Sequence, residues 1–198
     1  KEKKLIIHDD TRIDNYYWLN ERENPEVISY LDEENKYTQS ILKSTKSFQK
    51  KLFNEMKSRI KEDDNSVPYF YNDYWYVTKY EKGNDYPIYT RKYKQLDAKE
   101  EIILDVNLLA KDYKYFRVSG ISISPDNKKV SYGVDTLSRR IYTIKIKNLD
   151  TDEMYSDNIE GVNSYAAWAD DSETIFYTGK DSQTLRSDKI FRHKLDSD

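Results

Sequence analysis

Residues Ile121–Asp135 read ISISPDNKKVSYGVD, and this stretch has the pattern of a β-hairpin. Isoleucine alternates with serine over Ile121–Ser124, which is the two-residue period of a half-buried strand. Pro125 then has no N–H to donate to a sheet, and the Asp-Asn pair after it suits a turn. Apolar alternation restarts over Val130–Val134. Two antiparallel strands joined by a short turn are therefore predicted.

A second copy of this pattern follows 46 residues further along the chain. Tyr165–Trp168, Ala169–Ser172 and Thr174–Tyr177 occupy the positions of the first strand, the turn and the second strand. Each copy continues into a third strand, at Ile141–Leu149 and at Ile190–Leu195. Repeats of roughly 40–50 residues with four short strands are the signature of a β-propeller blade. The fold class predicted is mostly β, with a partial propeller.

Composition excludes several classes of protein. Of the 198 residues, 37% are hydrophobic and 35% are charged, and 19 are tyrosines, which suit half-exposed strands. The 33 basic and 36 acidic residues are interspersed, so no nucleic-acid partner is expected. No apolar run approaches the ~20 residues that a membrane helix needs, so no membrane partner is expected either.

The chain contains no cysteine, which excludes disulfides and thiolate metal ligands. A cysteine-free composition favours a reducing compartment, so a cytoplasmic location is expected. A periplasmic or secreted location is the alternative if a signal peptide precedes Lys1.

The first part of the chain is predicted to form an arm with two helices. Over Lys1–Asn20 turn residues alternate with short apolar groups, so an irregular segment is expected. Asn24 can cap a first helix and Pro25 fits its first position, while a second helix is expected from about Thr45. Because two isolated helices bury too little apolar surface to be stable, the arm must pack on another body of protein.

The charged, turn-rich segment Lys61–Pro68 separates helical from strand patterning. It predicts a boundary between residues 1–66, the arm, and residues 67–198, the propeller. Glu62, Asp63 and Asp64 could form a cation site, but a solvated linker is the favoured interpretation, since no further ligand converges on them in sequence.

Three blades are predicted after this boundary, at residues 69–105, 116–159 and 161–198. The first would contain four strands, the second would place Met154–Tyr155 near its outer strand, and the third has no fourth strand. Because propellers close with about 4–8 blades, the chain is predicted to be a fragment of a longer protein. The strands expected in the first blade are Tyr69–Tyr71, Tyr74–Lys79, Ile88–Tyr93 and Glu101–Leu104.

No catalytic, cofactor-binding or metal-binding residue is predicted. His8 and His193 are the two histidines, and no metal-ligand spacing surrounds either of them. Gly120–Ser124 begins like a G-x-S-x-G nucleophile elbow, but it ends in serine. Ser122 also lies inside an alternating strand, whereas the elbow needs a sharp strand-to-helix turn. The glycines are too dispersed to cradle a phosphate, so no cofactor is expected.

Five segments together resemble the N-terminal part of oligopeptidase B (protease II), within the prolyl oligopeptidase family of serine peptidases. They cover most of the chain and occur in the same order as in that family. The segments are TRIDNYYWLNERENPEV (Thr11–Val27), RIKEDDNSVPY (Arg59–Tyr69), YEKGNDYPIYTRK (Tyr80–Lys92), SPDNKKVSYGVDTLSRRIYTIKIKNLDTDE (Ser124–Glu153) and TLRSDKIFRHKL (Thr184–Leu195).

The resemblance implies a helical arm that packs on a C-terminal α/β-hydrolase domain, and a seven-bladed propeller that admits only short peptides. It implies cleavage after Lys or Arg by a Ser-Asp-His triad in the hydrolase domain, which lies outside this chain. No catalytic residue carries over, and the chain alone is expected to be inactive. Arg139 and Arg140 are candidates for charged contacts with the hydrolase domain.

Three alternatives remain at this point. The parent protein could be a proline-specific relative of oligopeptidase B. The chain could belong to a propeller that binds peptides or proteins without catalysis. It could also assemble with copies of itself through exposed strand edges.

Overall fold

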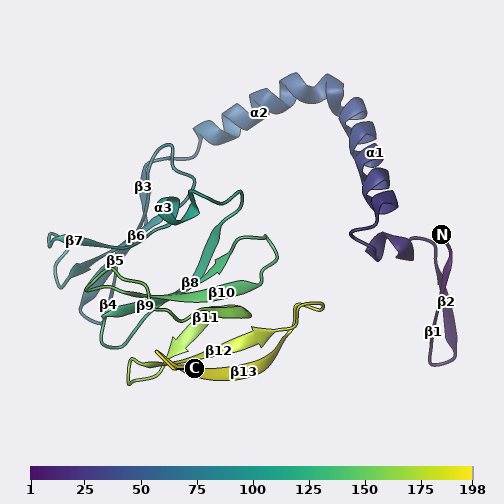
Figure 1. Cartoon of the computed structure of the whole chain (residues 1–198). Helices are drawn as coiled ribbons and strands as arrows, with labels where there is room; N and C mark the ends of the chain where they lie inside the picture. Colours follow the sequence, from purple (N-terminus) through teal and green to yellow (C-terminus); the bar gives the residue numbers. More distant parts are fainter. Residues whose placement is uncertain (198) are drawn as a thin grey trace. The chain divides into compact units, whose positions relative to one another are not determined.

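The computed structural model describes residues 1–197, and the chain divides into two compact units between Lys61 and Glu62 (Figure 1). This break lies inside the charged segment Lys61–Pro68, a few residues before residues 66 and 67. Strand β3 (Asp64–Asn65) pairs with β5 (Tyr74–Tyr80), which ties the acidic segment to the second unit. The partner strand lies more than ten residues away, so local composition gives no sign of this pairing.

The first unit begins with a β-hairpin of β1 (Lys3–Ile7) and β2 (Asp10–Asp14). The prediction of an irregular segment is wrong for these residues. His8 and Asp9 form the connection with φ of +51° and +62°. Two consecutive left-handed residues are the geometry of a type I′ turn, whose twist matches that of the flanking strands.

Helices α1 (Pro25–Leu42) and α2 (Lys46–Ser58) follow, and a 3₁₀ turn at Lys43–Thr45 joins them. The predicted start is confirmed: the Asn24 side chain accepts a hydrogen bond of 2.9 Å from the backbone N–H of Glu26. Val27 is the buried residue of these helices, and none of the described helices is long and apolar enough to cross a membrane. The remaining large apolar residues of the two helices are exposed: Ile28, Tyr30, Leu31, Tyr37, Ile41, Leu42, Phe48, Leu52, Phe53 and Met56.

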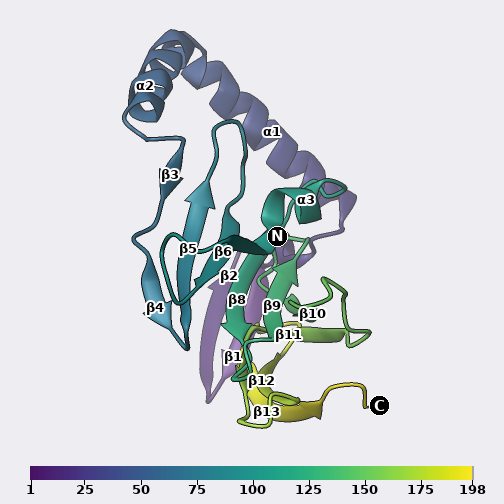
Figure 2. The same ribbon diagram turned by 90° about the vertical axis from the view of Figure 1, so that its left-hand side faces the viewer.

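The second unit begins with a small antiparallel sheet that matches the first predicted blade. Its strands after β3 are β4 (Tyr69–Tyr71), β5, β6 (Ile88–Tyr93) and β7 (Glu100–Asp105). Both β3 and β4 pair with the same edge of β5, so together they form the end strand of this sheet (Figure 2). We call this sheet blade one.

A short helix, α3 (Val106–Ala110), follows blade one and was not predicted. The Asp105 carboxylate caps it by accepting hydrogen bonds from the backbone N–H groups of Asn107 and Leu108, at 2.9 and 3.3 Å. An aspartate followed by apolar residues is the usual sequence signal for such a cap.

Six antiparallel strands form the larger sheet, in the order in which they occur in the chain. The β9–β10 pairing has an unbroken register. Strand β11 changes partner along its length. Ile159 and Val162 of β11 lie opposite β10, whereas Ala166 lies opposite Tyr177 of β12. The strands are β8 (Arg117–Ile123), β9 (Lys129–Asp135), β10 (Tyr142–Asn148), β11 (Ile159–Trp168), β12 (Thr174–Lys180) and β13 (Ser187–Lys194).

This change of partner makes the first half of β11 the outer strand of one blade and its second half the inner strand of the next. Blade two is therefore β8, β9, β10 and the start of β11, and blade three is the end of β11, β12 and β13. The predicted hairpin and its repeat are confirmed as β8–β9 and β11–β12. Met154 bridges to Lys147, close to the outer edge of blade two as expected.

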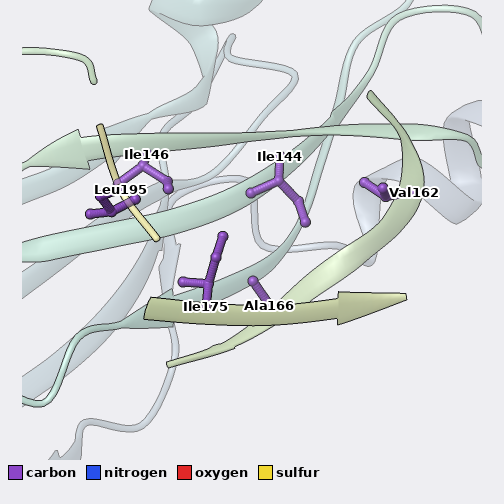
Figure 3. Close-up of a cluster of buried hydrophobic side chains, with 6 residues drawn as sticks. All are labelled: Ile144, Ile146, Val162, Ala166, Ile175 and Leu195. Carbon is purple, nitrogen blue, oxygen red and sulfur yellow. The ribbon is translucent and has the colours of Figure 1, made fainter. Parts of the chain in front are cut away.

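Two apolar clusters hold the blades together. One joins blades two and three and is drawn in Figure 3, with Ile144 and Ile146 of β10 facing Ile175 of β12. The other joins blades one and two and includes Ile103, Val130 and Tyr132. Since each cluster draws residues from two blades, burial of apolar surface favours stacking of the sheets.

Tyr132 and Tyr76 give this core a predicted pH dependence. Burial raises the pKa of each hydroxyl from 10.0 to about 12. Between pH 10 and 12 an unfolded chain releases these protons while the folded chain retains them, so the free energy of unfolding falls as pH rises. Urea unfolding at pH 9.5, 10.5 and 11.5 measures the decline. Tyr132→Phe should make it shallower, and an unchanged slope would contradict this account.

Candidate functional site

The residues that could suggest catalysis do not come together. Ser122 lies within β8, and its carbonyl accepts a hydrogen bond of 3.1 Å from Trp168 Nε1. His193 Nε2 is bonded to Asp157 Oδ1, and no described serine hydroxyl is bonded to that histidine. His8 lies in the β1–β2 turn. Ser122 is thus a strand residue, as predicted.

The acidic segment is part of the fold of blade one. Asp63 Oδ1 accepts a hydrogen bond of 2.7 Å from the backbone N–H of Lys82, and Asp64 belongs to β3. Within residues 1–197 no group of three or more His, Cys, Asp and Glu side chains is arranged to hold a metal ion. The Asp63 carboxylate and the pairing of β3 therefore position the start of the second unit.

Equivalent residues of blades two and three are hydrogen-bonded to each other. The Trp168 indole donates to Ser122 O at 3.1 Å, and Ser172 Oγ accepts from the backbone N–H of Asp126 at 3.0 Å. Both pairs are 46 residues apart, the period of the sequence repeat. The repeat therefore sets the register between blades as well as the strands within them.

Two glycines allow β11 to approach β8 and β9. A Cβ atom on Gly120 would lie 2.2 Å from Ser164 O, and one on Gly133 would lie 2.5 Å from Ser164 Cα. Gly120 also has a φ of +67°, which L-residues with a side chain rarely adopt. Backbone rather than side chains fills this contact between blades two and three.

The turns after the inner strands connect blades one and two. The Asn72 amide donates to Pro125 O at 2.9 Å and to Asn127 Oδ1 at 3.0 Å, and the Asn127 amide donates back to Asn72 O at 3.1 Å. Arg91, whose side chain is 3% exposed, donates to Asn127 O at 2.6 Å and to Glu101 Oε2 at 2.8 Å. These bonds fix blade two against blade one at this end of the sheets.

Asp126 keeps the β8–β9 turn in one conformation. Partial burial disfavours its charged form, but bonds from Ser124 Oγ, from the backbone N–H of Lys128 and from Lys129 Nζ outweigh that effect. Together they hold the pKa of Asp126 below its usual range. The turn is therefore anchored by an ionised carboxylate at neutral pH.

A recess of about 540 Å³ opens between the strands of blade one and strand β8 of blade two, with a contribution from blade three. Tyr69 and Tyr71 border it from β4, Val118–Ile123 of β8 forms one wall, and Tyr165 contributes from β11. None of its lining residues carries a charge. These tyrosines were not predicted to be site residues, although the tyrosine-rich strand Tyr69–Tyr71 was a sequence signal for an aromatic surface.

The segment with the two candidate arginines is rigidly placed. The buried Asp135 carboxylate accepts hydrogen bonds from the backbone N–H groups of Leu137, Arg139 and Arg140, at 2.9, 3.4 and 2.8 Å. Lys180 Nζ donates to Arg140 O at 2.5 Å. Both arginines are exposed and belong to the second unit.

Comparison with known proteins agrees with this architecture. The family model for the prolyl oligopeptidase N-terminal β-propeller domain matches residues 1–198. The chain is 38% identical to Dipeptidyl aminopeptidase BI of Pseudoxanthomonas mexicana over 95% of its length, and 35% identical to Protease 2 of Moraxella lacunata over 97%. It spans 28% and 29% of the lengths of these two relatives.

Solved structures show the same arrangement. Oligopeptidase B from Leishmania major matches with a TM-score of 0.90 and 29% identity, and the Trypanosoma brucei enzyme with covalently bound antipain matches with 0.87 and 26%. Each match covers 100% of this chain and 30% of the known structure. The match covers every residue of the chain, and the chain therefore belongs to the prolyl oligopeptidase family and corresponds to its N-terminal β-propeller portion, with similarity to Protease 2 and oligopeptidase B.

Proposed function

We propose that this chain is the gating portion of a serine oligopeptidase that hydrolyses short peptides after Lys or Arg. The observation that carries the proposal is the match of 97% of the chain to 29% of Protease 2, and of 100% of the chain to 30% of oligopeptidase B. In those relatives the propeller portion is joined to a C-terminal catalytic domain in the same polypeptide. The triad of the parent protein would lie in the corresponding domain.

The described geometry suits a gate. Stacked blades joined by turn-to-turn hydrogen bonds and apolar clusters form a stiff wall, which limits the size of what passes beside it. The exposed apolar stripe of α1 and α2 supports the further proposal that the arm packs on the hydrolase domain, since such a stripe is unfavourable in water. Arg139 and Arg140 stay proposed contacts with that domain.

The test is hydrolysis of blocked peptide 4-nitroanilides by the full-length protein. Substrates that end in Arg or Lys should give a kcat/KM at least ~100-fold above the matched Gln substrate, because an uncharged side chain leaves a charged specificity site unpaired. A large folded protein that contains the same basic residues should resist cleavage. Preference for Pro over Arg and Lys would contradict the proposal and favour a proline-specific peptidase.

A second candidate function comes from the name of one relative. The match to Dipeptidyl aminopeptidase BI, at 38% identity, favours the release of dipeptides from a free amino end. Each Arg substrate is therefore assayed with a free and with an acetylated amino terminus. Cleavage of the free dipeptide substrate alone would favour this second function. Absence of cleavage in every substrate would favour a propeller that only binds.

A further inference from the structure

We propose that the recess between blade one and strand β8 is a peptide-binding subsite that takes an uncharged, extended segment of a peptide. The identification of this peptide as a substrate rests on the proposed function, whereas binding itself does not. The subsite is made by all three blades: Tyr69 and Tyr71 from β4, Val118–Ile123 from β8 and Tyr165 from β11.

The end strands of two sheets border the recess. β8 ends the larger sheet, and β3 with β4 ends the sheet of blade one. An end strand presents N–H and C=O groups along one edge, and an extended peptide recognises such an edge through its own backbone. One of the β8 acceptors, Ser122 O, is already bonded to Trp168 Nε1. The register of β8 with β9 shifts between Ser119 and Ser122, so the strand is irregular where it borders the recess.

Aromatic side chains also border the recess. Tyr71 and Tyr165 are 63% and 57% exposed beside the recess, and Tyr69 stacks on Tyr76 with ring centroids 5.2 Å apart. Tyrosine offers a large contact surface with few rotatable bonds, so little conformational entropy is lost on binding. The recess volume of about 540 Å³ lies within the range usual for ligand sites.

Because no charged residue within residues 1–197 lines the recess, the recess favours an uncharged peptide segment. Among the described residues that line the recess there is no Asp, Glu, Lys, Arg or His. A charged side chain entering it would lose hydration without gaining a partner. The recess therefore complements residues other than the Lys or Arg that the proposed function assigns to the cleavage site.

The test is isothermal titration of the full-length protein with the blocked hexapeptide acetyl-Ser-Leu-Ser-Tyr-Ala-Gly-amide. This probe has no Lys or Arg, so it is not a substrate under the proposed function. Saturable binding with a Kd below about 1 mM is expected. Replacing the leucine of the probe with glutamate should weaken binding at least about tenfold, because no lining residue compensates the carboxylate.

Tyr71→Ser and Tyr165→Ser should each weaken binding of the uncharged probe about three- to tenfold, since each removes an aromatic contact surface. Tyr80→Ser is the matched control, because Tyr80 is 49% exposed on β5 but does not line the recess. Melting temperatures of all three variants should stay close to that of the original protein, since these side chains are exposed.

Three results would overturn the subsite: no binding at millimolar probe, equal affinity for the glutamate probe, or equal weakening by Tyr80→Ser. The subsite and the proposed function can fail independently of each other. Hydrolysis after Arg and Lys without probe binding would contradict the subsite alone. Probe binding without any hydrolysis would contradict the peptidase and leave the subsite standing.

Discussion

Gly120→Ala is expected to lower the free energy of unfolding by about 3 kcal/mol or more. Two costs add. The residue has a φ of +67°, where a side chain costs about 1 kcal/mol. The new Cβ would also lie 2.2 Å from Ser164 O, so β11 must move away from β8. Urea denaturation followed by circular dichroism measures the loss.

Two other glycines separate these costs. Gly161 has a φ of +71° with nothing within 4 Å of a built Cβ, so Gly161→Ala should show the backbone cost alone, about 1 kcal/mol. Gly133 lacks the positive φ but would meet Ser164 Cα at 2.5 Å, so Gly133→Ala should show the steric cost alone. If Gly120→Ala costs no more than Gly161→Ala, close approach of blades two and three does not contribute to stability.

Ile146→Ala is expected to cost about 2–5 kcal/mol, because it removes buried methyl groups from the cluster between blades two and three. Ile146 is 0% exposed and packs with Ile144, Ile175 and Leu195 (Figure 3). The cavity that remains is bordered by two blades, so both should lose stability in one transition. Denaturant unfolding followed by tryptophan fluorescence and by far-UV circular dichroism tests this coupling.

The control is Ile190→Ala on β13, because Ile190 is 80% exposed. That substitution should change the free energy of unfolding by less than about 0.5 kcal/mol. Equal effects of the two substitutions would show that the cluster does not stabilise the blades. Separate transitions for the two spectroscopic probes would show that the blades unfold independently.

Much of the fold was predictable because strand and helix patterns are local. The alternation in Ile121–Asp135, the cap at Asn24 and the strands of blade one all appear in the structure close to their predicted positions. The 46-residue repeat correctly implied that equivalent residues would meet, as Trp168 and Ser122 do. The lack of a catalytic constellation stays a prediction about the chain as a whole.

Other features were not visible in the local sequence patterns. The hairpin of β1 and β2 was missed because its turn, His8 and Asp9, contains neither glycine nor asparagine. The pairing of Asp64–Asn65 was missed because its partner, β5, is a separate strand that follows β4. In both cases the sequence around the residue fits a loop, and pairing with another strand overrides that preference.

The sequence was sufficient to predict the order of the strands, the blade repeat and the family resemblance, because all three follow from local periodicity and motif spacing. The tertiary structure decided that β11 serves two blades, that Gly120 must have no side chain, and that uncharged residues from three blades surround one recess. Periodicity specifies which face of a strand is buried. Contacts between blades specify what that face meets, and those contacts join residues far apart in the chain.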